Sequence, residues 1–265
     1  MIFCIAALRG ENAGMCGRFT LTTTSNELHK RFGVRVLQNI APRWNIAPSQ
    51  SSLIFRQSSL EVSATFAEFG LRVGQNGKRL INARAETVSE KPIFRDAFSV
   101  SRCLVPSSGW YEWAGKGRPF HVQLADARVM AFAGLYFKSG SPSQAEQFVI
   151  LTIAAEAELA KVHHRSPLVL PVSNWQSWLS GAEVEAEACL VPPLARYFNI
   201  YPVASAVGDI SQDNASLVAP SIHQTHLFRQ SCKAIYLRVN FLPIGVPLPT
   251  RQLCKCHNNR AATPR

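Results

Sequence analysis

Short runs of apolar residues, some alternating with polar ones and some continuous, follow one another along the first 153 residues. Clusters of Gly, Ser and Pro separate them, and runs of this length and spacing predict β-strands joined by turns. We expect strands over residues 17–21, 52–56, 60–66, 79–83, 101–105, 110–113, 120–124, 129–137 and 148–153. Residues 43–48 (Arg-Trp-Asn-Ile-Ala-Pro) are expected to form a loop leading into the second strand.

Helical signals are fewer and most of them come later. Thr24 and Glu27 have the spacing of a capping box, which predicts a short helix ending near Phe32. Further helices are expected over 154–162, over 173–179 with Ser173 as N-cap, and over 182–189. We find no repeats, no glycine-rich phosphate loop after a strand and no regular βαβ alternation. The pattern predicts an α+β fold, a single domain with a largely antiparallel sheet or barrel-like core and a few flanking helices.

Composition divides the chain into three parts. Residues 1–14 show no periodicity and end in a loop-like run, so we expect an N-terminal extension that is removed or that precedes a true start at Met15. Residues 15–221 carry the predicted elements and are expected to form the folded domain. Residues 222–265 contain seven Lys and Arg and no Asp or Glu, and we expect them to form a basic, disordered tail.

The net charge of +11 belongs largely to that tail, because residues 1–221 hold 21 basic and 17 acidic residues. A body that is only mildly basic permits nucleic-acid binding without arguing for it. The tail also holds Cys254, Cys256 and three histidines. Their Cys-x-Cys spacing does not match that of zinc knuckles, so we expect no metal and no other cofactor.

No segment reaches the roughly 18 apolar residues that span a bilayer. The apolar opening, residues 1–8, is short and no positive residue precedes it, which makes a poor signal peptide. Residues 13–16 resemble a lipoprotein cleavage site only loosely, because Met15 is bulky. Seven cysteines without framework spacing indicate reduced thiols rather than a disulfide scaffold. We therefore expect a cytoplasmic protein without membrane contact.

Residues 15–19 (Met-Cys-Gly-Arg-Phe) hold the most reactive candidate. Removal of Met15 would leave Cys16 with both a free α-amine and a thiol, each partly nucleophilic at neutral pH. Such a 1,2-aminothiol condenses with an aldehyde twice, first as an imine and then as a five-membered thiazolidine. An internal cysteine cannot do this, because its nitrogen is an amide. Taken alone, these residues nevertheless favour a small buried hydrophobe at the start of a strand.

A second stretch, residues 81–87, places an amide (Asn82), a guanidinium (Arg84) and a carboxylate (Glu86) at alternating positions. In an extended chain these three side chains would share one face. The plainer interpretation is a solvated edge strand, and taken singly it is preferred.

Two more stretches carry titratable groups. Glu112 lies among three aromatic residues in 109–113, where desolvation would raise its pKa and suit it to proton transfer. The alternative is an exposed carboxylate with the aromatic residues turned inward. His163, His164 and Arg165 close a predicted helix, and the alternative for them is a set of cations favoured by the helix dipole. Each alternative is preferred when its stretch is taken by itself.

Taken together, these stretches resemble the SRAP (SOS-response-associated peptidase) family, whose members process abasic sites in DNA. The resemblance covers residues 15 to about 220 and rests on motifs in family order. They are 15–19 (Met-Cys-Gly-Arg-Phe), 44–48 (Trp-Asn-Ile-Ala-Pro), 82–87 (Asn-Ala-Arg-Ala-Glu-Thr), 102–106 followed by 109–113, 163–167 and 201–203. So many motifs in order form a specific signal, which outweighs the plainer interpretations.

The resemblance implies that Cys16, once N-terminal, traps the aldehyde of a ring-opened abasic sugar as a thiazolidine, a covalent DNA–protein crosslink. It also implies that Asn82 orients the aminothiol and that Glu112 shuttles protons. His163 would handle the sugar hydroxyl and the Schiff-base steps, including slow reversal. The candidates for phosphate contacts are Arg18, Arg84 and Arg165, joined by Thr152 as a hydroxyl donor.

The implied partner is single-stranded DNA containing abasic sites, bound without sequence specificity by a nucleoid-associated monomer in the DNA damage (SOS) response. The same Cys16 with Glu112 and His163 would explain the peptidase name, by removing residues that precede the cysteine. If residues 1–14 are translated, they must be cut off first. If Met15 is the start, methionine aminopeptidase suffices, and we favour this route.

Two other functions remain open. One is a cysteine hydrolase acting on peptides or amides, with Cys16 as nucleophile and His163 as base. The other is a non-catalytic single-strand binder whose affinity is electrostatic. The chain also departs from the family, because 69–73 (Phe-Gly-Leu-Arg-Val) keeps only part of a Trp-Gly-Leu-x-Pro-x-Trp stretch whose aromatics stack on bases. Stacking is worth roughly 1–3 kcal/mol per base, so DNA affinity is expected to be weakened. His164 and Ser166 also stand where the family more often has other residues.

Overall fold

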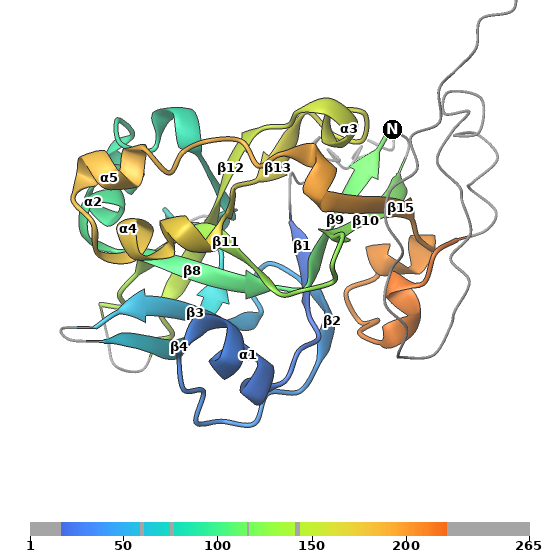
Figure 1. The fold of residues 1–265 in the computed structure, drawn as a ribbon, viewed down its shortest axis with the longest axis horizontal. Helices are drawn as coiled ribbons and strands as arrows, with labels where there is room; N and C mark the ends of the chain where they lie inside the picture. The colour runs from blue at the N-terminus through green and yellow to red at the C-terminus, as the bar shows by residue number, and fades with distance from the viewer. Residues whose placement is uncertain (1–16, 59–60, 75–76, 116, 141–143, 222–265) are drawn as a thin grey trace, which may run out of the picture. The chain divides into compact units, whose positions relative to one another are not determined.

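Two β-sheets organise the chain in the computed structural model, which describes residues 17–221 apart from 59–60, 75–76, 116 and 141–143 (Figure 1). The first sheet is antiparallel throughout and has the strand order β15-β10-β9-β1-β2 within the described residues. Its strands are β1 (Arg18–Leu21), β2 (Arg43–Ile46), β9 (Gly109–Ala114), β10 (Arg118–Leu124) and β15 (Phe198–Pro202).

The second sheet curls into a barrel, because the pairing of β11 with β12 closes the ring β12-β4-β3-β8-β11. The ring strands are β3 (Ser51–Gln57), β4 (Val62–Phe69), β8 (Arg102–Ser107), β11 (Met130–Phe137) and β12 (Gln147–Ala154). The additional strands are β7 (Asn82–Arg84), β13 (Arg165–Pro167) and β14 (Val169–Leu170). The predicted α+β fold with a largely antiparallel, barrel-like core is confirmed.

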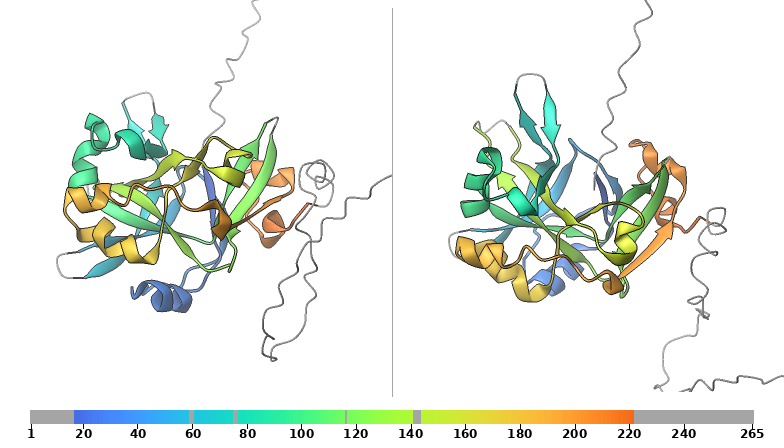
Figure 2. Two further views of the ribbon diagram at one scale, coloured as in Figure 1. Left: turned by 45° about the horizontal axis from the view of Figure 1, so that its top comes forward. Right: turned by 90° about the horizontal axis from the view of Figure 1, so that it is seen from above.

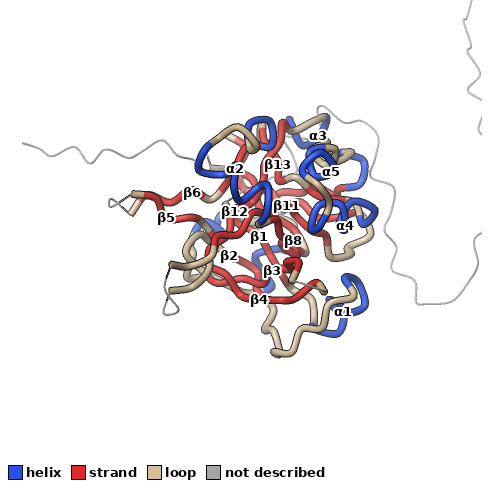
Figure 3. Tube along the Cα trace, turned by 90° about the vertical axis from the view of Figure 1, so that its left-hand side faces the viewer, coloured by secondary structure: helices blue, strands red, loops and turns tan. Residues whose placement is uncertain are grey.

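Strand β12 is the element that brings distant segments together. One of its edges pairs in parallel with β4 and then β7, and the other pairs antiparallel with β11 and then β13. Thr152 therefore has Arg84 of β7 on one side and Pro167 of β13 on the other. A separate hairpin, β5 (Leu71–Val73) with β6 (Lys78–Leu80), extends from the end of β4 (Figure 3).

The helices are short and lie outside the strands (Figure 2). Helix α1 (Ser25–Phe32) begins with the predicted capping box, in which Glu27 N donates to Thr24 Oγ1 and the Glu27 carboxylate accepts from Thr24 N. The others are α2 (Pro92–Val100), α3 (Ala157–Ala160), α4 (Trp175–Ser180) and α5 (Glu183–Glu187). Within the described ranges, none of these helices is both long and apolar enough to cross a lipid bilayer.

Phe19 of β1 joins the two sheets. Its ring is 1% exposed and makes edge-on contacts with Phe69 and Phe132, with ring centroids 5.6 and 6.1 Å away. Trp110 of β9 meets Phe132 in the same way at 5.8 Å. Aromatic residues from the first sheet thus pack onto the barrel. Since Phe19 is the second residue of β1, this packing fixes the start of that strand.

Several predicted elements differ in the structure. Residues 43–46, expected as a loop, form β2, because the outer edge of this strand is satisfied by the Asp213 carboxylate, which accepts from Trp44 N and Asn45 N. The expected strand over 79–83 is broken into β6 and β7. Glu86 lies on a 3₁₀ turn (η1, Ala85–Thr87), so it does not share a strand face with Asn82 and Arg84.

The helix predictions were also partly wrong. The helix expected over 154–162 shrinks to α3, because Ala154 still belongs to β12, where its N–H bonds Glu86. Ser173 is not an N-cap, since it lies on a 3₁₀ turn (η2, Val172–Asn174) ahead of α4. Helix α2 was not predicted at all.

Candidate active site

Glu112 sits in β9 and is only 3% exposed, which rules out the interpretation as an ordinary surface carboxylate. Its Oε2 lies 3.9 Å from Nδ1 of His163, within ion-pair range but too far for a hydrogen bond. The next strand of the sheet on one side is β1, in which Arg18 pairs with Tyr111 directly before Glu112. A buried carboxylate beside an imidazole is a pair suited to moving protons.

The imidazole of His163 is half-buried, with 18% of the side chain exposed. Its Nδ1 lies 3.2 Å from both the backbone nitrogen and the backbone oxygen of Arg165. Burial lowers the pKa of His163, and the hydrogen bond to the Arg165 backbone opposes this shift, while the charges of His164 and Arg165 add to it. The lowered pKa of His163 favours the neutral imidazole at neutral pH, the form that can accept a proton and return it.

Arg165 is 9% exposed and is held by Glu86 rather than directed to solvent. Its Nη1 and Nη2 donate to the two carboxylate oxygens of Glu86 at 2.6 and 2.8 Å, and Nη2 also donates to Thr152 O at 2.5 Å. Glu86 accepts a further hydrogen bond from Ala154 N. Chiefly through the hydrogen bond from Arg165, the pKa of Glu86 falls to about 2. The Glu86–Arg165 pair, which we call the brace, thus ties β13 and the turn η1 to β12.

The remaining predicted residues lie on both sides of this brace. Thr152 is fully buried, and its hydroxyl oxygen accepts from Arg165 at 3.3 Å. Asn82 is half-buried on β7 and donates from Nδ2 to Ile150 O at 3.3 Å. Arg84, two residues on, is exposed. The structure thus brings Glu112 to His163, His163 to the backbone of Arg165, and the Arg165 side chain to Thr152, while Arg84 alone of these is exposed.

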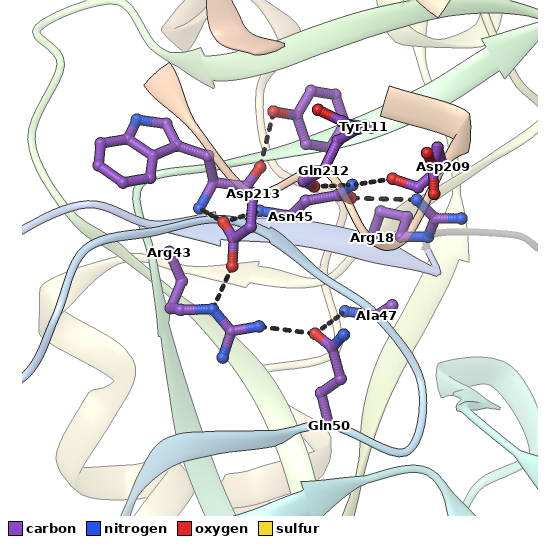
Figure 4. A network of polar contacts seen from close by, with 10 residues as sticks. Arg18, Arg43, Asn45, Ala47, Gln50, Tyr111, Asp209, Gln212 and Asp213 are labelled. Atoms are coloured by element: carbon purple, nitrogen blue, oxygen red, sulfur yellow. Dashed lines mark hydrogen bonds and ion pairs between the residues drawn. The ribbon is translucent and has the colours of Figure 1, made fainter. Parts of the chain in front are cut away.

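Arg18 is part of a second polar network, at the start of β1 (Figure 4). Its guanidinium donates to Asn45 Oδ1 at 3.1 Å, Val207 O at 2.5 Å and Gly208 O at 3.1 Å. It also lies 5.8 Å from the ring centroid of Trp113, in cation–π range. Burial lowers the pKa of Arg18, although the carboxylate of Asp209 opposes that shift, and the group stays charged.

Cys16 lies outside the described residues, as do residues 1–14, the tail 222–265 and the tail's candidate zinc ligands. The described residues begin at Gly17, which is buried.

The description "SOS response associated peptidase (SRAP)" belongs to the family model that matches residues 15–210 of this chain. The chain is an SRAP protein. Among its relatives, abasic site processing protein YoqW of Bacillus subtilis is 29% identical over 221 residues, covering 77% of this chain and 99% of the relative. Abasic site processing protein YedK of Escherichia coli is 30% identical over 228 residues, covering 78% of this chain and all of the relative.

Two solved structures share this fold. A protein from Bacteroides thetaiotaomicron superposes with a TM-score of 0.67 at 20% identity, covering 78% of this chain and all of that one. A phage-related protein from Bordetella bronchiseptica gives a TM-score of 0.62 at 24% identity, covering 71% and 94%. At these identities the likeness establishes the fold alone.

One departure from the family pattern now has a structural account. Phe69, which stands in the partial Trp-Gly-Leu motif, is fully buried and stacks on Phe148 with the ring centroids 5.2 Å apart. It belongs to the core of this SRAP domain and is not available to a base. Weakened stacking on DNA therefore stays a prediction.

Sequence reasoning missed three residues that support the site, namely Glu86, Asn45 and Asp213. Glu86 was noted only as part of an alternating face, and its partner Arg165 lies 79 residues away. Asp213 reaches Trp44 across 169 residues. No local spacing signals either contact, although Asn45 stands inside a motif that marked the family.

Proposed function

We propose that this protein processes abasic sites in single-stranded DNA, with Cys16 as an N-terminal residue that forms a covalent thiazolidine with the ring-opened sugar. The observation that carries the proposal is the buried Glu112, 3.9 Å from His163 and on the strand that pairs with β1. Arg18 begins β1, and only two peptide units separate it from Cys16. Chain connectivity therefore keeps the two Cα atoms within about 7.6 Å. The names of the relatives support the same substrate.

The reaction balances without an external redox partner. The α-amine of Cys16 adds to the aldehyde carbon, and the carbinolamine loses water to give an imine. The thiolate then adds to the imine carbon, forming the C–S bond and closing the ring, while the nitrogen takes up one proton. Glu112 delivers a proton to the departing hydroxyl and receives the thiol proton, the exchange to which a buried carboxylate is suited.

The neighbouring groups supply position and charge. His163, a neutral imidazole, exchanges protons with the sugar hydroxyl and with Glu112. Asn82 orients the aminothiol through its amide. Arg84 and Arg18 bind phosphates, since a guanidinium suits that role. Thr152 and Arg165 were expected from the sequence to join them, but Arg165 is bonded to Glu86 and Thr152 is buried beside Arg165. We assign both to the support of His163.

The peptidase activity implied by the family name fits the same residues. A chain that carries residues 1–14 has no free amine at Cys16, so these residues must be removed before the crosslink forms. The family match begins at residue 15, which supports Met15 as the residue removed last. We propose that methionine aminopeptidase exposes Cys16 in a chain started at Met15, and that Cys16, Glu112 and His163 cut any longer extension.

The test incubates protein started at Met15 with a labelled single-stranded oligonucleotide that carries one abasic site. A heat-stable adduct on a denaturing gel that is lost in Cys16→Ala supports the proposal. Cleavage of peptides without an adduct would favour a cysteine hydrolase instead. Salt-sensitive binding that Cys16→Ala leaves intact, again without adduct, would favour a non-catalytic binder.

A second variant tests the proton shuttle. Glu112→Gln preserves the shape of the side chain and removes its ability to exchange a proton, so the adduct should form about 100-fold or more slowly. Glu90→Gln, an exposed carboxylate on the loop after η1, serves as the matched control and should react like the parent. An unchanged rate in Glu112→Gln would remove Glu112 from the mechanism.

A further inference from the structure

The motif at residues 44–48 marked the family in the sequence, yet the proposed chemistry gives it no task. In the structure its strand, β2, is held by the segment that runs from η4 (Ser205–Gly208) to Asp213 (Figure 4). Asp213 accepts from Trp44 N at 2.5 Å, from Asn45 N at 3.1 Å and from the guanidinium of Arg43. We call Asn45 together with residues 205–213, which end at Asp213, the clasp.

Asn45 connects the two sides of the clasp. It is fully buried, and its Nδ2 donates to the backbone oxygens of Val207 (3.2 Å), Asp209 (3.1 Å) and Gln212 (2.8 Å). Its Oδ1 accepts from Arg18 Nη1 at 3.1 Å. Both ends of this amide are thus used, with the nitrogen fixing the 205–213 segment and the oxygen fixing Arg18. Only an amide supplies donors and an acceptor in this arrangement.

The clasp orients Arg18 through neutral acceptors and not through a direct bond to a carboxylate. The oxygens that accept from Arg18 within the described residues belong to the Asn45 amide and to the Val207 and Gly208 carbonyls. These are neutral groups. The carboxylate of nearby Asp209 instead accepts from the nitrogen and the hydroxyl of Ser211, at 2.9 and 2.8 Å. The guanidinium therefore has a fixed direction and keeps a charge that a phosphate can use.

Arg18 is also the first residue of β1, and its backbone pairs with Tyr111 next to Glu112. The hydrogen bond from Arg18 to Asn45 therefore also fixes the point at which the residues before Arg18 enter the site. Tyr111 adds a further tie, because its hydroxyl donates to Trp44 O at 2.8 Å. The clasp thus holds β1, β2 and β9 in register at the end of the sheet where Cys16 precedes Arg18.

We propose that Asn45 is a positioning residue for the crosslinking reaction, which acts by orienting Arg18 and, through the first residues of β1, the aminothiol of Cys16 relative to Glu112. Asp213 and the 205–213 segment hold Asn45 in place. The inference rests on the proposed function, since it assigns to the 44–48 motif a role in that same reaction. It also assigns a role in catalysis to a segment almost 200 residues from the nucleophile.

The test separates binding from reaction in Asn45→Ala. The first-order rate of adduct formation is measured at saturating abasic DNA, and the Kd is measured with unmodified single-stranded DNA. We expect the saturated rate to fall at least about tenfold, because a displacement of about 1 Å in a reacting group can cost about 100-fold. The Kd should rise only a few-fold, since Arg18 keeps its charge. Thermal unfolding is recorded alongside.

Gln50→Ala is the matched control. Gln50 belongs to the same network and accepts from Arg43 at 2.7 Å and from Ala47 N at 3.1 Å, but it does not contact Arg18 (Figure 4). It should lower the unfolding temperature without slowing the saturated rate by more than about twofold. If Asn45→Ala and Gln50→Ala have equal saturated rates, Asn45 is only structural and the inference is wrong.

Arg18→Lys keeps the charge and loses the forked geometry, and it carries the test should Asn45→Ala not fold. We expect a reduced saturated rate with a Kd close to that of the parent, whereas an unchanged rate would overturn the inference. Failure of the proposed function is distinguishable, because the parent protein itself would then form no adduct.

Discussion

Replacement of Glu86 by Gln tests the brace that holds Arg165 beside His163. Bonding to Arg165 lowers the pKa of Glu86 from 4.5 to about 2, a shift worth about 3 kcal/mol at face value. Since 44% of the Glu86 side chain is exposed, solvent screening reduces the contribution to about 1 kcal/mol. Glu86→Gln also leaves the charge of Arg165, 9% exposed, without a counter-ion, which adds a further cost. We expect the free energy of unfolding to fall by about 1–2 kcal/mol at pH 7.

The pH dependence gives the sharper readout. Because the folded-state pKa of Glu86 is depressed, its contribution is complete above pH 4.5 and is lost as the pH falls from 4.5 towards 2. In urea unfolding at pH 7, 5, 4 and 3, the gap between parent and Glu86→Gln should narrow below pH 4.5. The exposed Glu90→Gln serves as control and should show no such narrowing. A gap that stays constant or widens in acid would refute the ion pair as the cause.

Three further substitutions probe the scaffold. Phe19→Ala should lower the free energy of unfolding by about 3–5 kcal/mol in urea titrations, because its buried ring joins the two sheets. Thr24→Ala removes the α1 cap and should cost about 1 kcal/mol in the same assay; a neutral result would mean that the capping box contributes nothing. Burial lowers the pKa of His121 from 6.5 to about 4, so the unfolded chain takes up this proton at a higher pH than the folded protein does. The free energy of unfolding therefore falls as the pH drops from 6.5 to 4. His121→Gln should therefore flatten the loss of stability over that range, and an equal slope in both proteins would contradict this.

The strands were predictable where burial is continuous. All residues of β8 and all but the last of β11 are buried, and such runs are conspicuous in the sequence. Strand β2 was missed because its outer edge is completed by a side chain, Asp213, and not by another strand. Helix α2 did carry a local signal that was overlooked, with Pro92 at its first position and Phe94, Ala97 and Phe98 on one buried face.

The sequence named candidate residues but not their arrangement. Short local motifs singled out Asn82, Glu112 and His163, and the structure places Glu112 beside His163. The burial of Arg165 depends on β12 running between β7 and β13, which pair with it in opposite senses. Non-local pairing of this kind leaves no trace in the spacing of residues. A guanidinium in a motif therefore could not be assigned to solvent or to the core before the fold was known.

The partners of the three predicted phosphate-binding arginines divide them into two kinds. Arg165 is bonded to the carboxylate of Glu86, so its charge is already compensated. Arg18 is bonded to neutral oxygens and Arg84 is exposed, so among the described residues neither guanidinium is bonded to a carboxylate. Each phosphate contact on a single strand contributes about 0.7 to the slope of log K against log salt. Arg18→Gln and Arg84→Gln should each reduce the magnitude of that slope by about this amount, measured by fluorescence anisotropy.

Arg165→Gln should leave the slope unchanged while slowing adduct formation, because it releases the brace beside His163. A slope that falls equally in all three variants would show that Arg165 leaves Glu86 for a phosphate when DNA binds, and the division drawn from the free protein would then be wrong.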